Sequence, residues 1–259
     1  MHSKKGHLWR NHSLDIVALI LGISLILGLW TFATTYGNYP NFVLPEPNAV
    51  FKELKIVLAN GLLWYHLKAT LTEMMGGLAL GLSLAVVLGY VLGKSPLLER
   101  FFGPYIVASQ SIPIVAIAPL LIIWFGTGKP GKMLICALIV FFPILINTIV
   151  GIRSVDENFK LLMHALRASR WQTFLYLEVP AALPVLLGGL KIGVTLSAIG
   201  AVVSEFVGAD RGLGYLISLS KGMFNTSLMF VALITLTGLS LILYLAVMGL
   251  EKWLLGWRR

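Results

Sequence analysis

Apolar residues gather along the chain into six long runs, each close to the length that crosses a bilayer. A transmembrane helix needs about 20 consecutive apolar residues. The runs are Leu14–Thr34, Met74–Gly93, Phe101–Phe125, Met133–Gly151, Ala182–Gly208 and Leu228–Leu250. The pattern predicts an all-α integral membrane protein with six transmembrane helices, in which residues 1–13 form an N-terminal tail and residues 14–259 form one transmembrane domain.

The third run differs from the others because prolines interrupt it. They are Pro104, Pro113 and Pro119. A proline in a transmembrane helix frees backbone carbonyls, which polar side chains or water must satisfy. Ser109, Gln110 and Ser111 stand beside Pro113. These three side chains either repair a kink or line a polar path for a solute.

The composition agrees with a membrane protein. Hydrophobic residues make up 58% of the 259 residues, charged residues 12%, and the mean hydropathy is +0.87. A soluble domain carries about 25% charged residues. These values exclude a soluble enzyme, a disordered chain and a secreted disulfide scaffold. The one cysteine, Cys136, lies in an apolar run and is expected to pack as a small hydrophobic residue.

The basic residues fall mainly on one side of the predicted membrane. The termini and the even-numbered loops hold twelve of the twenty, the odd-numbered loops hold seven, and Lys191 lies inside the fifth run. Positive charge marks the cytoplasmic side, so both termini are predicted to be cytoplasmic. The net charge of +9 is therefore interpreted as topology and not as a sign of a nucleic-acid partner.

The fourth loop, residues 153–184, is the longest segment between the later runs. Apolar residues in 158–176 alternate with basic ones, which predicts one amphipathic helix, or two short helices that meet near Ser169. Pro180 and Pro184 are expected to end it. Arg170, Trp171 and Phe174 follow Arg167 by three, four and seven positions. At this spacing the four residues are predicted to share a helix face. The segment either rests on the membrane surface or docks to a cytoplasmic protein.

Two ionisable residues of the fifth run are candidates for a role in transport, because charges inside a membrane are costly. Lys191 either snorkels to the headgroups or bonds locally, or it contacts a substrate. Glu205 either pairs structurally or lines a path. The sequence shows no Ser-His-Asp grouping and no metal-ligand spacing, so neither a catalytic nor a metal site is predicted.

Several motifs together resemble one family. The segment ALRASRWQTF at 165–174, followed by VPAALP at 179–184, resembles the cytoplasmic "EAA" loop of binding-protein-dependent ABC importer permeases. The resemblance is strongest to the nitrate, sulfonate and taurine branch. LPEP at 44–47, the SIP, APL and WFG motifs in 111–126, and GADRGLG at 208–214 resemble the same branch.

The loop also departs from the family pattern. The positions of the E-A-A triplet hold Leu161, Leu162 and Met163, and the position of the turn glycine holds Arg167. Glycine permits a positive φ, so an arginine there predicts a straighter junction or a different contact with the partner. The flanking motifs are intact, and the docking role is therefore kept.

The resemblance implies the membrane subunit of an ATP-driven importer with the type I permease fold, in a bacterial or archaeal cell membrane. It implies cytoplasmic ATP-binding subunits, an extracytoplasmic solute-binding protein, a second permease copy and surrounding lipid as partners, without nucleic acid. In this interpretation the ATPase contacts the coupling loop 153–184 through Arg167, Ser169, Arg170, Trp171, Phe174 and Pro180. The translocation path is expected to include Ser109, Gln110, Ser111, Lys191 and Glu205.

No cofactor is expected in this chain. It has no G-x-x-x-x-G-K-[ST] loop, so ATP is expected to bind a separate subunit. The SQSIP and APL motifs are most similar to vitamin-type members, which suggests riboflavin or a thiamine pyrimidine as substrate. Taurine, sulfonates and nitrate remain alternatives. A secondary transporter is a weaker alternative, because neither buried ion-coupling pairs nor inverted repeats are visible.

Overall fold

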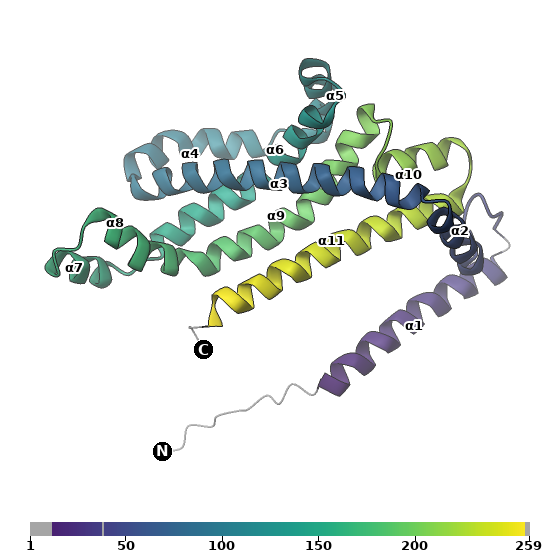
Figure 1. Cartoon of the computed structure of the whole chain (residues 1–259), viewed down its shortest axis with the longest axis horizontal. Helices are drawn as coiled ribbons and strands as arrows, with labels where there is room; N and C mark the ends of the chain where they lie inside the picture. Colours follow the sequence, from purple (N-terminus) through teal and green to yellow (C-terminus); the bar gives the residue numbers. More distant parts are fainter. Residues whose placement is uncertain (1–11, 38, 257–259) are drawn as a thin grey trace.

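The computed structural model describes residues 12–37 and 39–256, and the secondary structure within these residues is helical (Figure 1). Among them, four helical stretches are long and apolar enough to cross a membrane. They are α3 (Leu62–Lys94), α6 (Lys129–Arg153), the stretch formed by α8 (Arg170–Thr173), the π-helical turn η1 (Phe174–Glu178) and α9 (Val179–Gly208), and α11 (Thr226–Leu254).

The first and third predicted runs take less regular forms. The first lies in α1 (His12–Tyr36), whose described apolar stretch is Ile20–Tyr36. The third is divided into α4 (Pro96–Gln110) and α5 (Ile114–Phe125), and the two axes differ by 94°. The third run is therefore a bent pair of helices. The bend falls at Pro113, which caps α5, because the residue before a proline is disfavoured in a helix.

Helix α6 lies between α3 and α9 and contacts both along their lengths (Figure 1). Small residues stand at every fourth position of α3 and face α6: Gly77, Gly81, Ala85, Gly89 and Gly93. A Cβ atom at Gly81 would lie only 2.7 Å from the carbonyl oxygen of Ala137. Small residues of this kind let transmembrane helices approach closely. The backbones of α3 and α6 are thus nearly in contact.

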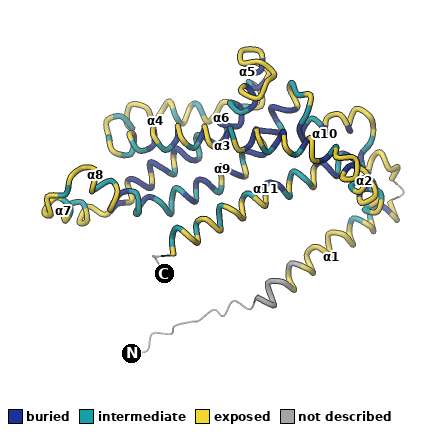
Figure 2. The backbone as a smooth tube through the Cα atoms, in the orientation of Figure 1, coloured by how far each residue is buried: buried dark blue, intermediate teal, exposed yellow. Residues whose placement is uncertain are grey.

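The opposite face of α6 approaches α9 in the same way. A Cβ at Gly200 would lie 2.7 Å from the Cα of Cys136, and Cys136 is completely buried, as expected of a small hydrophobic residue. Figure 2 shows that buried residues concentrate along α6 and α9. The core of the protein is therefore the three-helix stack of α3, α6 and α9.

Two amphipathic helices that the sequence analysis did not predict close one end of this stack, which we name the α10 end. They are α2 (Pro47–Ala59) and α10 (Leu213–Gly222). Each buries residues at helical spacing, Val50 and Val57 in α2 and Leu213, Leu216 and Ile217 in α10. The signal was present in the sequence, but each helix is too short to be recognised as a membrane span.

The opposite end carries α7 (Glu157–Ala165) and α8, and we name it the α7 end. The two short helices agree with the second of the alternatives predicted for the fourth loop. The expectation that Pro180 and Pro184 end the segment is wrong. Pro180 follows the π-helical turn η1 inside the continuous helical stretch Arg170–Gly208, and α9 continues through Pro184. Transmembrane helices tolerate such prolines because neighbouring groups satisfy the freed carbonyls.

Candidate functional site

A buried polar network fixes the loop between α9 and α10. Glu205 of α9 is only 2% exposed, and its Oε1 accepts a hydrogen bond of 2.6 Å from the hydroxyl of Thr70 in α3. The same hydroxyl accepts the backbone N–H of Leu213 at 2.7 Å, while Glu205 Oε2 accepts that of Gly214. His66 Nδ1 accepts the N–H of Gly212 at 3.0 Å. Three side chains therefore clamp three consecutive backbone amides.

The glycines of the GADRGLG motif make this clamp sterically feasible. Gly212 has φ +122°, and a Cβ there would lie 2.1 Å from the carboxyl carbon of Glu205. Only glycine combines this backbone conformation with so close an approach. The surroundings of Glu205 favour structural pairing over path lining, and its place on a transport path stays a prediction.

A buried ion pair lies in the same region. Lys132 Nζ of α6 stands 3.2 Å from Glu73 Oε1 of α3, and both residues are 2% exposed. Within the described residues, Glu73 Oε2 has no hydrogen-bond partner. Sequence reasoning missed the roles of His66, Thr70 and this ion pair, because their partners lie far away along the chain.

Lys191, the charge inside the fifth run, connects two helices. Its Nζ lies 2.8 Å from Glu251 Oε2 of α11, and both side chains are partly buried. This pairing is a side-chain bond within the protein, which was one of the alternatives from the sequence. Contact of Lys191 with a substrate stays a prediction.

The polar triplet beside Pro113 lies at the bend between α4 and α5. The hydroxyls of Ser109 and Ser111 donate to the carbonyls four residues earlier, at 2.7 and 3.4 Å. Gln110 and Ser111 are exposed. The two serine hydroxyls thus bond to carbonyls of α4, and Gln110 is accessible from outside the chain. A path-lining role for the triplet stays a prediction.

A groove between α9 and α11 also presents hydroxyl groups. Its volume is about 480 Å³, and its walls are mostly aliphatic. The hydroxyl-bearing residues that line it are Thr195, Thr237, Ser240 and Tyr244. An apolar groove with a few polar groups is typical of sites that bind small organic molecules.

The turn between α7 and α8 departs from the prediction. Arg167 lies outside both helices with φ +51°, so it does not share a helix face with Arg170, Trp171 and Phe174. The backbone keeps the left-handed conformation for which glycine is suited, and the expectation of a straighter junction is wrong. Ser169 then begins α8 with a capping box, in which it exchanges hydrogen bonds with Gln172.

The predicted coupling residues are divided between the surface and the body of the protein. Trp171 is 68% exposed, whereas the ring of Phe174 packs against the ring of Tyr90 in α3, with 5.2 Å between the two ring centroids. The buried carboxylate of Glu178 forms an ion pair with Lys94 and accepts a hydrogen bond of 3.0 Å from the Tyr90 hydroxyl. These contacts attach the α7–α8 segment to the end of α3.

Helix α7 exposes several large apolar side chains. Large side chains that are more than half exposed follow one another along it and the turn after it: Phe159, Leu161, Leu162 and Leu166. Trp171 of α8 is exposed as well, so the α7 end of the molecule presents several large apolar side chains. Surfaces of this kind mark sites of contact with proteins or membranes.

The helical architecture, the membrane-crossing stack and the appended α7–α8 segment define a multi-pass transport permease. Residues 77–256 match the family described as binding-protein-dependent transport system inner membrane component. The chain belongs to this family, and it is the permease of an ABC importer. Members of the family are components of transport systems.

Named relatives indicate the branch. The chain is 45% identical to the riboflavin transport system permease of Chloroflexus aurantiacus, over 93% of this chain and 90% of the relative. It is 34% identical to the formylaminopyrimidine transport permease of Halalkalibacterium halodurans, over 91% and 93%. It is 28% identical to the taurine transport permease of Escherichia coli, over 99% and 95%.

Solved structures show the same fold. The inward-facing MetNI methionine ABC transporter matches with a TM-score of 0.61 and 19% identity, covering 78% of this chain and 98% of the other. An amino acid ABC transporter matches with a TM-score of 0.57 and 17% identity, covering 77% and 95%. The predicted type I permease fold is confirmed.

Proposed function

We propose that this permease imports riboflavin, delivered by an extracytoplasmic solute-binding protein. The observation that carries the proposal is the 45% identity to a riboflavin permease along nearly the whole chain. A formylaminopyrimidine is the second candidate, because a permease named for it is 34% identical over a similar length. Both are planar heterocycles with polar edges, and the mostly aliphatic groove between α9 and α11 offers such a solute apolar walls and hydroxyl partners.

Uptake in cells tests the substrate. The permease, its ATP-binding subunit and its binding protein are expressed in cells that can neither make nor import riboflavin. Uptake of labelled riboflavin should depend on all three proteins, and excess unlabelled taurine should leave it unchanged. Uptake of the pyrimidine without riboflavin would support the second candidate, and uptake of taurine alone would refute both.

The α7–α8 segment is proposed to contact the ATP-binding subunits. ATP is proposed to bind those subunits, and this chain is proposed to bind no cofactor. The support is its exposed apolar surface and Trp171, since aromatic and arginine anchors dominate protein interfaces. Arg167, Ser169, Arg170, Phe174 and Pro180 belong to the same proposal. Ser169, Phe174 and Pro180 act by shaping the segment, because they cap α8, pack on α3 and begin α9.

Copurification tests this contact. Leu162→Ser removes an exposed apolar side chain of α7 and should lower recovery of the ATP-binding subunit at least tenfold. Leu97→Ser is the matched control, because Leu97 is also exposed but lies at the start of α4. Equal recovery with both variants would remove the assignment and favour a helix that only rests on lipid.

The functional unit is proposed to be a homodimer with all termini in the cytoplasm. The groove between α9 and α11 is open, which supports a path that a second copy completes. Two differently tagged copies should therefore copurify. In intact cells, an impermeant maleimide should label cysteines placed at Lys129 or Arg211, which lie at the α10 end. Labelling only after lysis would mean that the protein has the opposite orientation in the membrane.

A further inference from the structure

An apolar groove and a basic cleft meet at the α7 end of the molecule. The groove has a volume of about 720 Å³ and opens between α3, α6 and the start of α9. The cleft has a volume of about 430 Å³ and lies between the end of α3 and the α7–α8 segment. Tyr90 and Arg170 line both hollows, which therefore adjoin each other, and we treat the two together as one depression. We name it the α7-end depression.

The groove part of the α7-end depression has aliphatic walls. Val86, Val87 and Val91 contribute one wall from α3, and Leu183 and Leu186 contribute another from α9. Val87 is 62% exposed and Val91 45%. Val87 precedes Lys94, the last residue of α3, by about 10 Å at 1.5 Å per residue. The wall therefore lies at the depth of acyl chains, just inside one surface of the bilayer.

The cleft part of the α7-end depression is rich in cations. Its basic residues are Lys94, Lys160, His164 and Arg170, and the one carboxylate among its lining residues is Glu178. Lys94 already pairs with that carboxylate, and Lys160 pairs with Glu157. Within the described part of the chain, the Arg170 guanidinium has neither an ion pair nor a hydrogen bond. The cleft thus has positive charge in excess.

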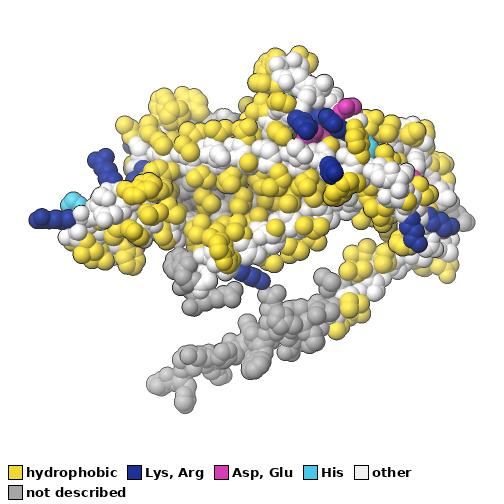
Figure 3. All heavy atoms as spheres, viewed as in Figure 1, with side chains coloured by type: hydrophobic (Ala, Val, Ile, Leu, Met, Phe, Trp, Pro, Cys, Tyr) yellow, Lys and Arg dark blue, Asp and Glu magenta, His cyan; other side chains and the backbone are white. Residues whose placement is uncertain are grey.

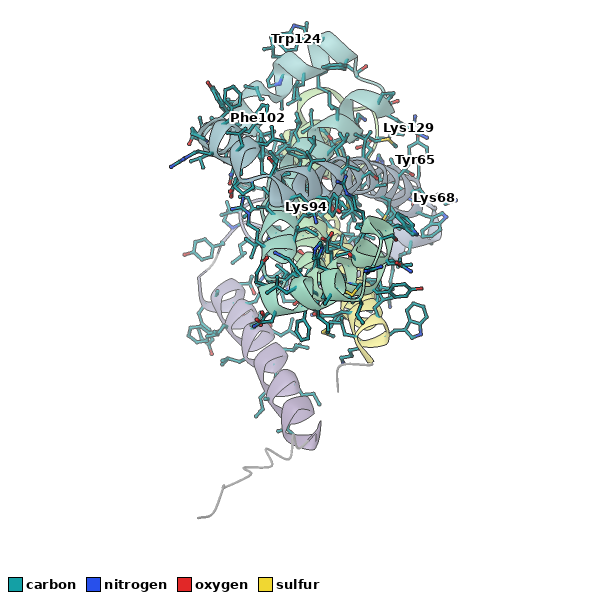
Figure 4. The ribbon with its side chains drawn as sticks, turned by 90° about the vertical axis from the view of Figure 1, so that its left-hand side faces the viewer. Tyr65, Lys68, Lys94, Phe102, Trp124 and Lys129 are labelled. Atoms are coloured by element: carbon teal, nitrogen blue, oxygen red, sulfur yellow. The ribbon has the colours of Figure 1, made fainter. Side chains whose placement is uncertain are left out.

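Exposed groups at the junction are of the type found at a membrane surface. Trp171 lines the groove and is 68% exposed, and tryptophan is enriched at the level of the lipid headgroups. Figure 4 looks onto this end of the molecule, with Lys94 near its centre, and Figure 3 shows separate basic side chains at this end beside hydrophobic surface. A hydrocarbon-lined groove leads here directly into a cationic cleft.

We propose that the α7-end depression binds one anionic glycerophospholipid from the adjoining leaflet. An acyl chain occupies the aliphatic groove, and the phosphate lies in the cleft between Arg170 and Lys94. Basic pockets between transmembrane helices bind anionic headgroups in this way. A soluble anion would leave the groove empty, and a zwitterionic lipid would leave the excess positive charge unmatched. The site is separate from the groove between α9 and α11.

Native mass spectrometry of the full-length permease in mild detergent tests the proposal. The probes are phosphatidylglycerol and phosphatidylcholine with identical acyl chains. The wild type should retain one phosphatidylglycerol in clear preference. Arg170→Gln should lower that retention about fivefold without affecting phosphatidylcholine, because one basic residue near a lipid headgroup contributes about that factor. Arg170→Lys should keep the preference.

A second variant tests the groove itself. Val87→Trp fills the aliphatic wall and should lower retention of both lipids. The matched controls are Ile242→Trp, at an apolar site of α11 that is 65% exposed, and Lys252→Gln, an exposed cation at the end of the same helix. Neither control should alter retention. The measurement uses the permease alone, so its result does not depend on the proposed ATPase contact.

Three results would overturn the proposal. Equal retention of the two lipids by the wild type would mean that the lipid is only annular. Unchanged retention of phosphatidylglycerol by both Arg170→Gln and Val87→Trp would mean that the lipid binds elsewhere. Absence of any retained lipid would mean that protein, such as a segment of a second copy, covers the groove.

Discussion

Replacement of Gly81 by alanine should destabilise the permease, although alanine is the better helix former. A Cβ at Gly81 would lie 2.7 Å from the carbonyl oxygen of Ala137 and 2.5 Å from Val140 Cγ2. A carbon and a carbonyl oxygen approach no closer than about 3.3 Å. Because the oxygen belongs to the backbone of α6, the two helices must separate by roughly 0.6 Å.

The cost follows from the contacts that this separation weakens. The attraction of one atom pair is about 0.1–0.2 kcal/mol at its optimal distance. A gap of about 0.5–1 Å removes a quarter to a half of that attraction. Taking roughly 40 pairs, as for one buried leucine, at a middle value of about 0.15 kcal/mol each, the loss is about 1.5–3 kcal/mol. Alanine regains about 1 kcal/mol of helix propensity. The net expectation is a destabilisation of about 0.5–2 kcal/mol.

The assay is reversible unfolding in mixed micelles, with Gly188→Ala as the matched control. Gly188 lies in α9, and a Cβ there would meet nothing within 4 Å. The control should be neutral or stabilising by up to about 1 kcal/mol, since only helix propensity changes. The reasoning would be refuted if both variants shifted the free energy of unfolding equally, or if Gly81→Ala were the more stable of the two.

Three further outcomes are expected. Arg167→Gly should stabilise the protein by about 0.5 kcal/mol in the same assay, because the relief of a positive φ outweighs glycine's entropy, and a loss of stability would contradict the strain. Glu205→Leu should cost about 3 kcal/mol and speed tryptic cleavage after Arg211, because buried donors lose their acceptor; unchanged cleavage would contradict the clamp. Lys191→Met and Glu251→Gln should show a coupling energy of about 1 kcal/mol in a double-mutant cycle, whereas additive effects would mean that the pair is not formed.

The positions of the membrane helices could be predicted because apolar length is a local property of the sequence. Helix α2 was missed although Val50, Leu54 and Val57 follow helical spacing, since thirteen residues are too few for a span. The continuation of α9 through Pro184 was missed because prolines end helices in water, where no neighbouring helix satisfies the freed carbonyls.

The candidate site was less predictable than the fold. Glu205 was recognised as unusual, but its partner Thr70 lies 135 residues away, and no pattern in one sequence pairs the two. Arg167 illustrates the opposite error, in which residue type outweighed context. The sequence predicted a straighter turn, whereas the turn keeps a backbone conformation that arginine only tolerates.

The close stacking of α3, α6 and α9 means that a tilt at one end of the stack displaces the other end. Helix α9 alone has 30 residues and is about 45 Å long. Backbones that nearly touch resist sliding past one another because of steric overlap, so we expect the three helices to tilt together. A tilt of about 5°, pivoting at the α7 end, would displace the clamped loop at the other end by about 4 Å over that length. A small rotation beside the α7–α8 segment would thereby displace the clamped loop at the α10 end by several ångströms.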